Sequence, residues 1–172
     1  MSKIRVVHYI NQFFAGVGGE EQAHIAPELR KELPPISTQL QGKLGEDFEV
    51  VATVVCGDSY FNENLESVQK ELLEMIKGCE PQLFIAGPAF NAGRYGVAAG
   101  TITKAVQDEL HIPAVTAMYE ENPGTDMFKK DVYILETSDS AAGMRKALPK
   151  LAKFAAKLAK GEEILSPKEE GY

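Results

Sequence analysis

Cysteine and tryptophan are scarce in this sequence, whose 172 residues include two cysteines and no tryptophan. Cys56 and Cys79 are too few for the disulfide framework on which small secreted domains depend. No apolar run reaches the roughly 20 residues of a membrane-spanning helix, and the first residues lead into a strand pattern without a signal-peptide core. We therefore expect a reduced, soluble, cytoplasmic protein without a membrane span.

Basic residues are fewer than acidic ones. The 18 Lys and Arg residues are spread among 25 Asp and Glu residues, which gives a formal net charge of −7. A chain without a basic block offers no surface for nucleic acid or anionic membranes. His8, His24 and His111 lie far from one another and from the cysteines, so the sequence indicates no metal site.

Nucleotide-binding motifs are missing as well. A dinucleotide fingerprint over "GVGGEE" (16–21) would need glycine at positions 16, 18 and 21, but residue 21 is Glu. The two acidic residues would also face the pyrophosphate, which is electrostatically unfavourable. We interpret this segment as a turn in which glycine adopts positive φ angles.

The sequence does contain a regular alternation of apolar strands and amphipathic helices. This alternation predicts an α/β fold with three layers: a mostly parallel sheet of about five strands with helices on both faces, flavodoxin-like or Rossmann-like. The expected strands are 4–10, 48–58, 81–89, 112–119 and 131–137, and the expected helices are 64–77, 95–110 and a long last helix capped by Ser138 or Asp139.

Three segments fit this pattern less well. Residues 20–33 are expected to be irregular with one helical turn, residues 36–44 are ambiguous, and Pro149 is expected to kink or divide the last helix. We assign residues 1–160 to a single domain and residues 161–172 to a polar tail, loose at its end.

Ligands of open parallel sheets bind outside the carboxyl ends of the strands. That rule selects the loops 11–20, 56–61, 87–95 and 119–130, which are richer in Gly, Asn and polar residues than the opposite connections.

The third of these loops, "AGPAFNAGRYG" (86–96), opens into a helix. The free N–H groups of a helix N-terminus favour a carboxylate, and Arg94 can add a two-point contact. Asn91, Gly93, Arg94 and Tyr95 are therefore candidates for binding a substrate carboxylate or a partner domain. The alternative, in which Asn91 caps the helix and Arg94 forms a surface ion pair, stays open.

The neighbouring loops add two further candidates. Asp58 either caps a helix or binds a cationic group of a ligand, and it disfavours the thiolate of Cys56, which we interpret as an inert buried residue. Tyr119 begins a long acidic loop, for which a solvated loop is favoured over a lid or a partner-facing surface.

Five segments of the chain resemble the glycine/sarcosine/betaine reductase family, in particular the N-terminal part of the selenoprotein subunit of component B. They are "VVHYINQFFAGVGGEE", "VCGDSYFNEN", "LFIAGPAFNAGRYGVAAGTI", "MYEENPGTDMFKKDVYILETSDSAAGMRKALP" and "LAKGEEI". The resemblance runs from Val6 to the last residues.

The resemblance implies reductive deamination of glycine or an N-methylated relative to acetyl phosphate in anaerobic, amino-acid-fermenting bacteria. In this family the amine is held as a Schiff base on a pyruvoyl group of the other component B subunits. A selenocysteine takes the carboxymethyl group and passes it to component A, component C releases acetyl phosphate, and thioredoxin supplies electrons.

The family's selenocysteine lies in a C-terminal part that nothing here matches. We therefore expect no catalytic residue and no cofactor in this chain, a tail leading toward an absent C-terminal domain, and no activity of the isolated chain. The expected partners are the other component B subunits, components A and C, and a small amino-acid substrate. Two alternatives remain open: a free-standing flavodoxin-like small-molecule enzyme and a pure docking module.

Overall fold

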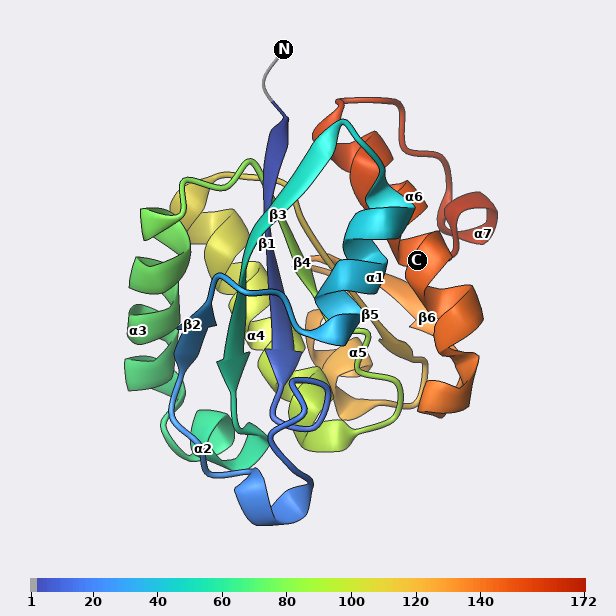
Figure 1. Ribbon diagram of the computed structural model, residues 1–172. Helices are drawn as coiled ribbons and strands as arrows, with labels where there is room; N and C mark the ends of the chain where they lie inside the picture. Colours follow the sequence, from blue (N-terminus) through green and yellow to red (C-terminus); the bar gives the residue numbers. More distant parts are fainter. Residues whose placement is uncertain (1–2) are drawn as a thin grey trace.

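A six-stranded sheet forms the centre of the molecule in the computed structural model, which describes residues 3–172 (Figure 1). The strands lie in the order β2-β3-β1-β4-β5-β6, and every neighbouring pair is parallel except β2 and β3. Their bounds are β1 (Ile4–Asn11), β2 (Glu28–Arg30), β3 (Phe48–Cys56), β4 (Leu83–Ala86), β5 (Ala114–Tyr119) and β6 (Tyr133–Thr137).

The five parallel strands confirm the predicted α/β class, and the sixth strand is an addition. β2 has three residues and pairs antiparallel with the outer edge of β3, Leu29 lying opposite Val54. A strand of three residues is too short to show an alternation of apolar and polar residues, so the sequence predicted only an irregular segment there. Leaving β2 aside, the parallel strands have the order 2-1-3-4-5 of flavodoxin-like folds.

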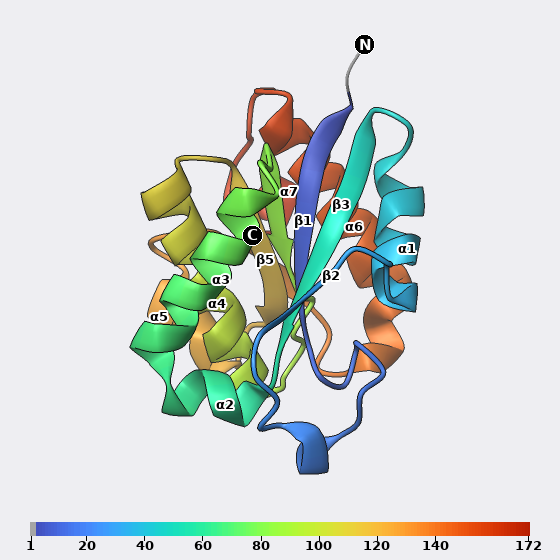
Figure 2. The same cartoon turned by 60° about the vertical axis from the view of Figure 1, so that its left-hand side comes forward.

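Two layers of helices cover the sheet, as the rotated view in Figure 2 shows. One face carries α1 (Pro35–Leu44) and α6 (Met144–Ala159), and the other carries α3 (Leu65–Gly78) and α4 (Gly93–Leu110). The short elements are η1 (Glu20–Gln22), α2 (Asp58–Glu63), α5 (Pro123–Phe128), η2 (Ala141–Gly143) and α7 (Pro167–Glu170).

An apolar core lies on each face of the sheet. Val68, Leu72 and Ile76 of α3 pack with Ile102 of α4 on one side, and α1 and α6 pack over the other. The apolar spacing on α3 therefore formed the predicted amphipathic helix.

Two prolines lie within helices. Pro35 occupies the first position of α1, where its missing N–H group is not needed, so it begins this helix. Pro149 lies inside α6, which is a single helix and is not divided there.

The C-terminal tail is docked, which corrects the expectation of a loose end. The ring of Tyr172 lies 4.8 Å from Tyr133 and 5.6 Å from Phe154 between centroids. The Glu136 N–H group donates to the Gly171 carbonyl over 2.8 Å. The tail thus covers the outer edge of β6 through the Tyr172 ring and the Gly171 carbonyl.

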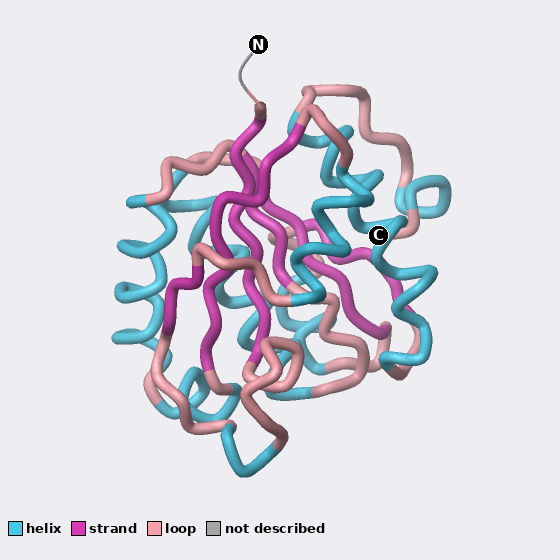
Figure 3. Tube along the Cα trace, viewed as in Figure 1, coloured by secondary structure: helices cyan, strands magenta, loops and turns pink. Residues whose placement is uncertain are grey.

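The loops after β1, β3, β4 and β5 gather at one edge of the sheet, the lower edge in Figure 3. Among residues 3–172, no helix combines the length and the apolarity that crossing a membrane requires.

Candidate functional site

The order of the parallel strands reverses between β1 and β4, and open α/β sheets bind ligands at such a switch point. A pocket of about 300 Å³ lies there. Its walls come from the loops after β1, β3 and β4 and from the segment that follows β6, and the lining residues are Asn11, Gln12, Phe13, Phe14, Gly19, Glu20, Asp58, Ala89, Phe90, Asn91, Ala92, Asp139, Ser140 and Ala141. Among the larger surface hollows, one lies between α3 and α4, one lies between α1 and α6, and one of about 580 Å³ lies beside the loop after β5 and the C-terminal tail.

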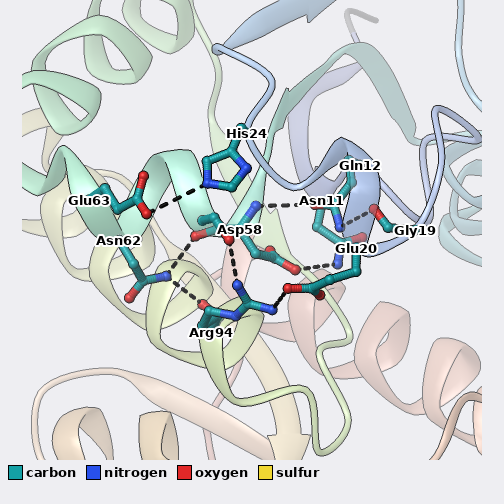
Figure 4. Close-up of polar contacts among 10 residues, drawn as sticks. Asn11, Gln12, Gly19, Glu20, His24, Asp58, Asn62, Glu63 and Arg94 are labelled. Atoms are coloured by element: carbon teal, nitrogen blue, oxygen red, sulfur yellow. Dashed lines mark hydrogen bonds and ion pairs between the residues drawn. The ribbon is translucent and has the colours of Figure 1, made fainter.

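Asn11 and Gln12 join the end of β1 to the start of α2. Asn11 Nδ2 donates to Asp58 Oδ2 over 3.0 Å, and Gln12 Oε1 accepts from the Asp58 N–H group over 3.1 Å (Figure 4). Both side chains are buried. Their loop was among those predicted to border a ligand site, but these two residues were not predicted, although two amide side chains directly follow an apolar strand.

Asp58 is the most unusual group of the pocket. Asp58 is 7% exposed. Its Oδ2 accepts a hydrogen bond from Asn11, and its Oδ1 has no hydrogen-bond partner. Burial raises the pKa of Asp58 to about 6, while the bond from Asn11 and the nearby Arg94 charge act in the opposite direction. At neutral pH the pocket therefore holds a carboxylate with one unsatisfied oxygen.

Arg94, at the start of α4, lies between two of the predicted loops. Its guanidinium donates to Ser59 Oγ and to a carboxylate oxygen of Glu20, so it contacts the loops 56–61 and 11–20 (Figure 4). The ion pair lowers the pKa of Glu20 and raises that of Arg94. Asn62 Nδ2 also donates to the Arg94 carbonyl over 3.1 Å. In this arrangement, each terminal nitrogen of Arg94 already donates one hydrogen bond.

The other predicted site residues separate into two groups. Asn91 is exposed and lines the pocket together with Asp58. Gly93 packs near Pro123, and Tyr95 is fully buried, its ring 5.9 Å from that of Phe14. Tyr119 is half-buried, and the negative charge of Glu121 is the main cause of its raised pKa. Gly93, Arg94, Tyr95 and Tyr119 thus surround the pocket without lining it.

Two buried hydroxyl groups lie without partners in this region. The Tyr9 and Tyr95 hydroxyls form no hydrogen bond, and the centroids of the two rings are 6.3 Å apart. Burial raises the pKa of both phenols, and the charge of Asp58 contributes to each shift. Both phenols therefore stay neutral and keep their protons.

The loop after β5 holds the predicted turn in place. Asn122 is fully buried, and its Nδ2 donates to the carbonyls of Phe90 and Ala92 over 2.9 and 3.1 Å. Its Oδ1 accepts from the Gly124 N–H group over 2.9 Å and caps α5. The loop after β5 thus contains a short helix with a buried cap, and most of its residues are exposed, as expected.

His8 supports the same turn from within the sheet. Its Nε2 lies 2.8 Å from the Gly87 carbonyl, and its Nδ1 lies 2.8 Å from Ser37 Oγ. Because a carbonyl only accepts, Nε2 carries the proton and Nδ1 accepts from the serine. Burial lowers the pKa of His8 to about 4, so the imidazole is a neutral structural link.

The cysteines offer no nucleophile to the pocket. Cys56 is fully buried, and burial together with the Asp58 charge raises its pKa to about 12. Cys79 ends α3, where its carbonyl accepts two bonds from the Arg5 guanidinium, at 3.0 and 2.7 Å. Within residues 3–172 no group of three His, Cys, Asp or Glu side chains is arranged to hold a metal ion.

The loop after β1 does not form a phosphate cradle. The N–H groups of Val17 and Gly18 both donate to the Gln12 carbonyl, at 3.0 and 3.4 Å, and the Phe14 N–H group donates to Asn11 Oδ1. Gly16 takes a φ of +78°. Gly16 and Gly18 both take positive φ angles, as expected for this turn, and the Phe14, Val17 and Gly18 amides form hydrogen bonds within the loop.

Comparison with known proteins gives a consistent result across the chain. The family model described as Glycine/sarcosine/betaine reductase selenoprotein B matches residues 3–172. The chain is 74% identical over its whole length to the Glycine reductase complex component B subunit gamma of Peptoclostridium litorale, of which it covers 39%.

Two further relatives carry the names of the other complexes. The chain is 59% identical over its whole length to the Sarcosine reductase complex component B subunit beta of Peptoclostridium acidaminophilum, of which it covers 39%. It is 40% identical to the Betaine reductase complex component B subunit beta of the same organism, over 98% of the chain and 38% of the relative.

The chain spans about two fifths of the length of these relatives. No solved structure matches it. Since the family model extends over all but the first two residues, the chain belongs to the glycine/sarcosine/betaine reductase selenoprotein B family.

Proposed function

We propose that this chain is the N-terminal, substrate-positioning part of a component B selenoprotein subunit, acting in the reductive deamination of glycine, sarcosine or betaine. The observation that carries the proposal is the family match over residues 3–172, combined with a switch-point pocket whose own residues include no activated nucleophile. Glycine is the first substrate to test, because the 74% identical relative is a glycine reductase subunit.

The chemistry of this proposal is divided between chains. The selenocysteine would come from the C-terminal part of the polypeptide, and the pyruvoyl group from other subunits of component B. The residues of this chain would bind and orient: Asp58 and Asn11 offer a fixed polar floor, and Phe13 and Phe90 add aromatic rings to the lining.

One observation favours a docking role at the same edge. Phe13 is 59% exposed and stacks edge-on against Phe14, with ring centroids 5.2 Å apart. A large exposed aromatic residue at the rim of a pocket suits a surface that another domain covers. Substrate positioning and docking of components A and C are compatible on this edge.

A free-standing flavodoxin-like enzyme has less support. Flavin and nucleotide phosphates need free N–H groups after the first strand, and here the Val17 and Gly18 amides are bonded within the loop. The fold alone does not assign a function.

Reconstitution tests the proposal. The complete component B, with components A and C and a thiol donor, is expected to form acetyl phosphate from its substrate, and the isolated 172-residue chain is expected to form none. Asn91→Trp, which places a bulky ring at an exposed pocket position, should abolish most turnover of the complete complex without changing its assembly. Asn64→Trp, exposed at the start of α3 and outside the pocket, is the matched control.

Two results would overturn the proposal. Acetyl phosphate formation by the isolated chain would show that the reactive group is present in it. Full activity of the Asn91→Trp complex would show that the pocket plays no part in the reaction.

A further inference from the structure

The helix α6 concentrates basic residues in an otherwise acidic chain. It carries Arg145, Lys146, Lys150, Lys153 and Lys157 and has no Asp or Glu, although the whole chain has a formal net charge of −7. These residues form no continuous basic run in the sequence, and the helix brings them together. α6 lies beside α1, which has no acidic residue either (Figure 1). The two helices therefore carry only positive side-chain charge.

Acidic side chains of the protein itself reach only the C-terminal half of α6. Lys157 pairs there with Glu170 over 2.5 Å. Within the described residues 3–172, no ion pair involves Lys43 of α1 or the first two charged residues of α6, Arg145 and Lys146. Positive charge is unfavourable at a helix N-terminus, and no side chain caps this one. An acidic group from another molecule would therefore stabilise this end of α6.

A groove of about 680 Å³ lies between α1 and this end of α6. Its apolar walls come from Met144, Leu148 and Pro149, and its charged members, Lys43 and Arg145, are both basic and exposed. The switch-point pocket and the hollow between α3 and α4, in contrast, include acidic residues in their walls. An apolar groove bordered by basic side chains fits an apolar side chain flanked by carboxylates.

Two residues of the groove are poorly suited to the helices that contain them. Gly42 lies inside α1, where glycine is unfavourable, and a Cβ atom there would have no neighbour within 4 Å. Pro149 lies inside α6, where it cannot donate the usual helical hydrogen bond. No contact within the chain requires a glycine at position 42, and its missing side chain leaves space in the groove. Residues that oppose their local structure in this way are expected at functional sites.

We propose that the groove between α1 and α6 docks an acidic amphipathic segment of another protein of the reductase complex. An apolar side chain of that segment enters the groove, and its carboxylates pair with Lys43 and Arg145. The inference rests on the proposed function, which supplies the partner, and goes beyond it, because the groove shares no lining residue with the switch-point pocket. A protein segment is favoured over nucleic acid or an anionic membrane, because the acidic chain repels extended polyanions.

Photo-cross-linking in the complete component B, mixed with components A and C, tests the proposal. p-Benzoylphenylalanine replaces Gln39, which is exposed and lines the groove, or Ser67, which is exposed on α3 at the other face of the sheet. Mass spectrometry is expected to find the Gln39 cross-link on an Asp- and Glu-rich segment of another chain, and none from Ser67. The yield should fall by roughly tenfold between about 50 and 500 mM salt, because salt screens the charges.

A steric variant tests the shape of the groove. Gly42→Leu fills it without changing its charge and should lower the yield of the Gln39 cross-link by about tenfold. The open space around Gly42 admits the new side chain in the folded protein. Gly78→Leu is the matched control, because Gly78 is also helical, exposed and without neighbours, but lies in α3. Its yield should equal that of the wild type.

A charge variant tests the basic border. Lys43→Glu combined with Arg145→Glu should lower the yield by about tenfold or more and remove its salt dependence, because charge-assisted bonds are lost. Lys70→Glu combined with Lys77→Glu makes the same change in net charge at exposed positions of α3 and should have no effect.

The proposal is overturned if Gln39 cross-links no other protein above the Ser67 level, if it reaches only a second copy of this chain, or if the cross-linked segment is not acidic. Wild-type yields from both the steric and the charge variant would also overturn it, as would retention on phosphatidylserine vesicles without a protein cross-link. These failures are distinct from failure of the proposed function. Acetyl phosphate formation without the cross-link would remove the docking site and leave the function, and a cross-linked complex that forms no acetyl phosphate would do the reverse.

Discussion

The side chain of Asn122 lies so close to the backbone of Gly96 that a Cβ atom at Gly96 would fall 2.1 Å from Asn122 Oδ1. This contact joins the loop after β5 to the first turn of α4. The same side chain donates to the Phe90 and Ala92 carbonyls, so the turn that borders the pocket depends on a glycine at position 96.

Gly96→Ala is therefore expected to destabilise the chain. A methyl group there displaces a buried, fully bonded side chain, and overpacking of this kind costs about 1–3 kcal/mol of unfolding free energy. Gly42→Ala is the control, because Gly42 is also helical but has open space around it. That change should stabilise by roughly 0.5–1 kcal/mol. Urea unfolding measures both, and equal effects would contradict the contact.

Asp58→Asn is expected to stabilise the chain at neutral pH. The folded-state pKa of about 6 exceeds the ordinary value of 3.8, so ionisation of Asp58 opposes folding as pH rises through that interval. The full pKa difference corresponds to a gain in unfolding free energy of at most about 3 kcal/mol. The gain should be present above pH 6 and should vanish near pH 4.

Asp131→Asn is the control for that measurement, since it makes the same substitution at an exposed position. Thermal unfolding of both variants between pH 4 and 8 gives the comparison. A loss of stability in Asp58→Asn at pH 7 would contradict this prediction, because it would show that the Asp58 carboxylate makes a net stabilising interaction in the folded chain.

Arg94→Ala should barely change the stability of this chain. The Arg94 and Glu20 side chains are 48% and 71% exposed, and exposed ion pairs contribute about 0–1 kcal/mol. In the complete component B, turnover should fall by up to about fivefold, the most that an ion pair of this strength can contribute, because the loop that Glu20 carries would lose its bond to α4.

Lys104→Ala removes a comparable exposed ion pair, to Asp108, further along the same helix and outside the pocket. Turnover of that variant should match the wild type. Equal turnover of Arg94→Ala and Lys104→Ala would remove Arg94 from the site.

The Cys56 thiol is expected to resist alkylation in the folded chain. It is fully buried with a pKa of about 12, so almost no thiolate exists at pH 8. Iodoacetamide labelling followed by mass spectrometry should modify it only at the rate of unfolding, and urea should expose it. Cys56→Ala separates its signal from that of Cys79, and rapid labelling of native Cys56 would reveal an activated thiol.

The local pattern of the chain was enough to predict the class of fold and the edge that carries the pocket. Buried strands such as β3 and amphipathic helices such as α3 show their periodicity within ten or fifteen residues, and chain direction then places the polar loops together. The prediction of Asp58 and Asn91 rested on that geometry, and both line the pocket. Their roles in binding stay predictions.

Only the tertiary structure determined which groups these side chains contact. Arg94 meets Glu20 across 74 residues of sequence, Asn11 meets Asp58 across 47, and Tyr172 folds back onto Tyr133. A sequence pattern records which side chains are polar or apolar, but burial and charge pairing arise from contacts between distant segments. The acidic lining of the pocket, the paired guanidinium of Arg94 and the docked tail therefore became visible only in the folded chain.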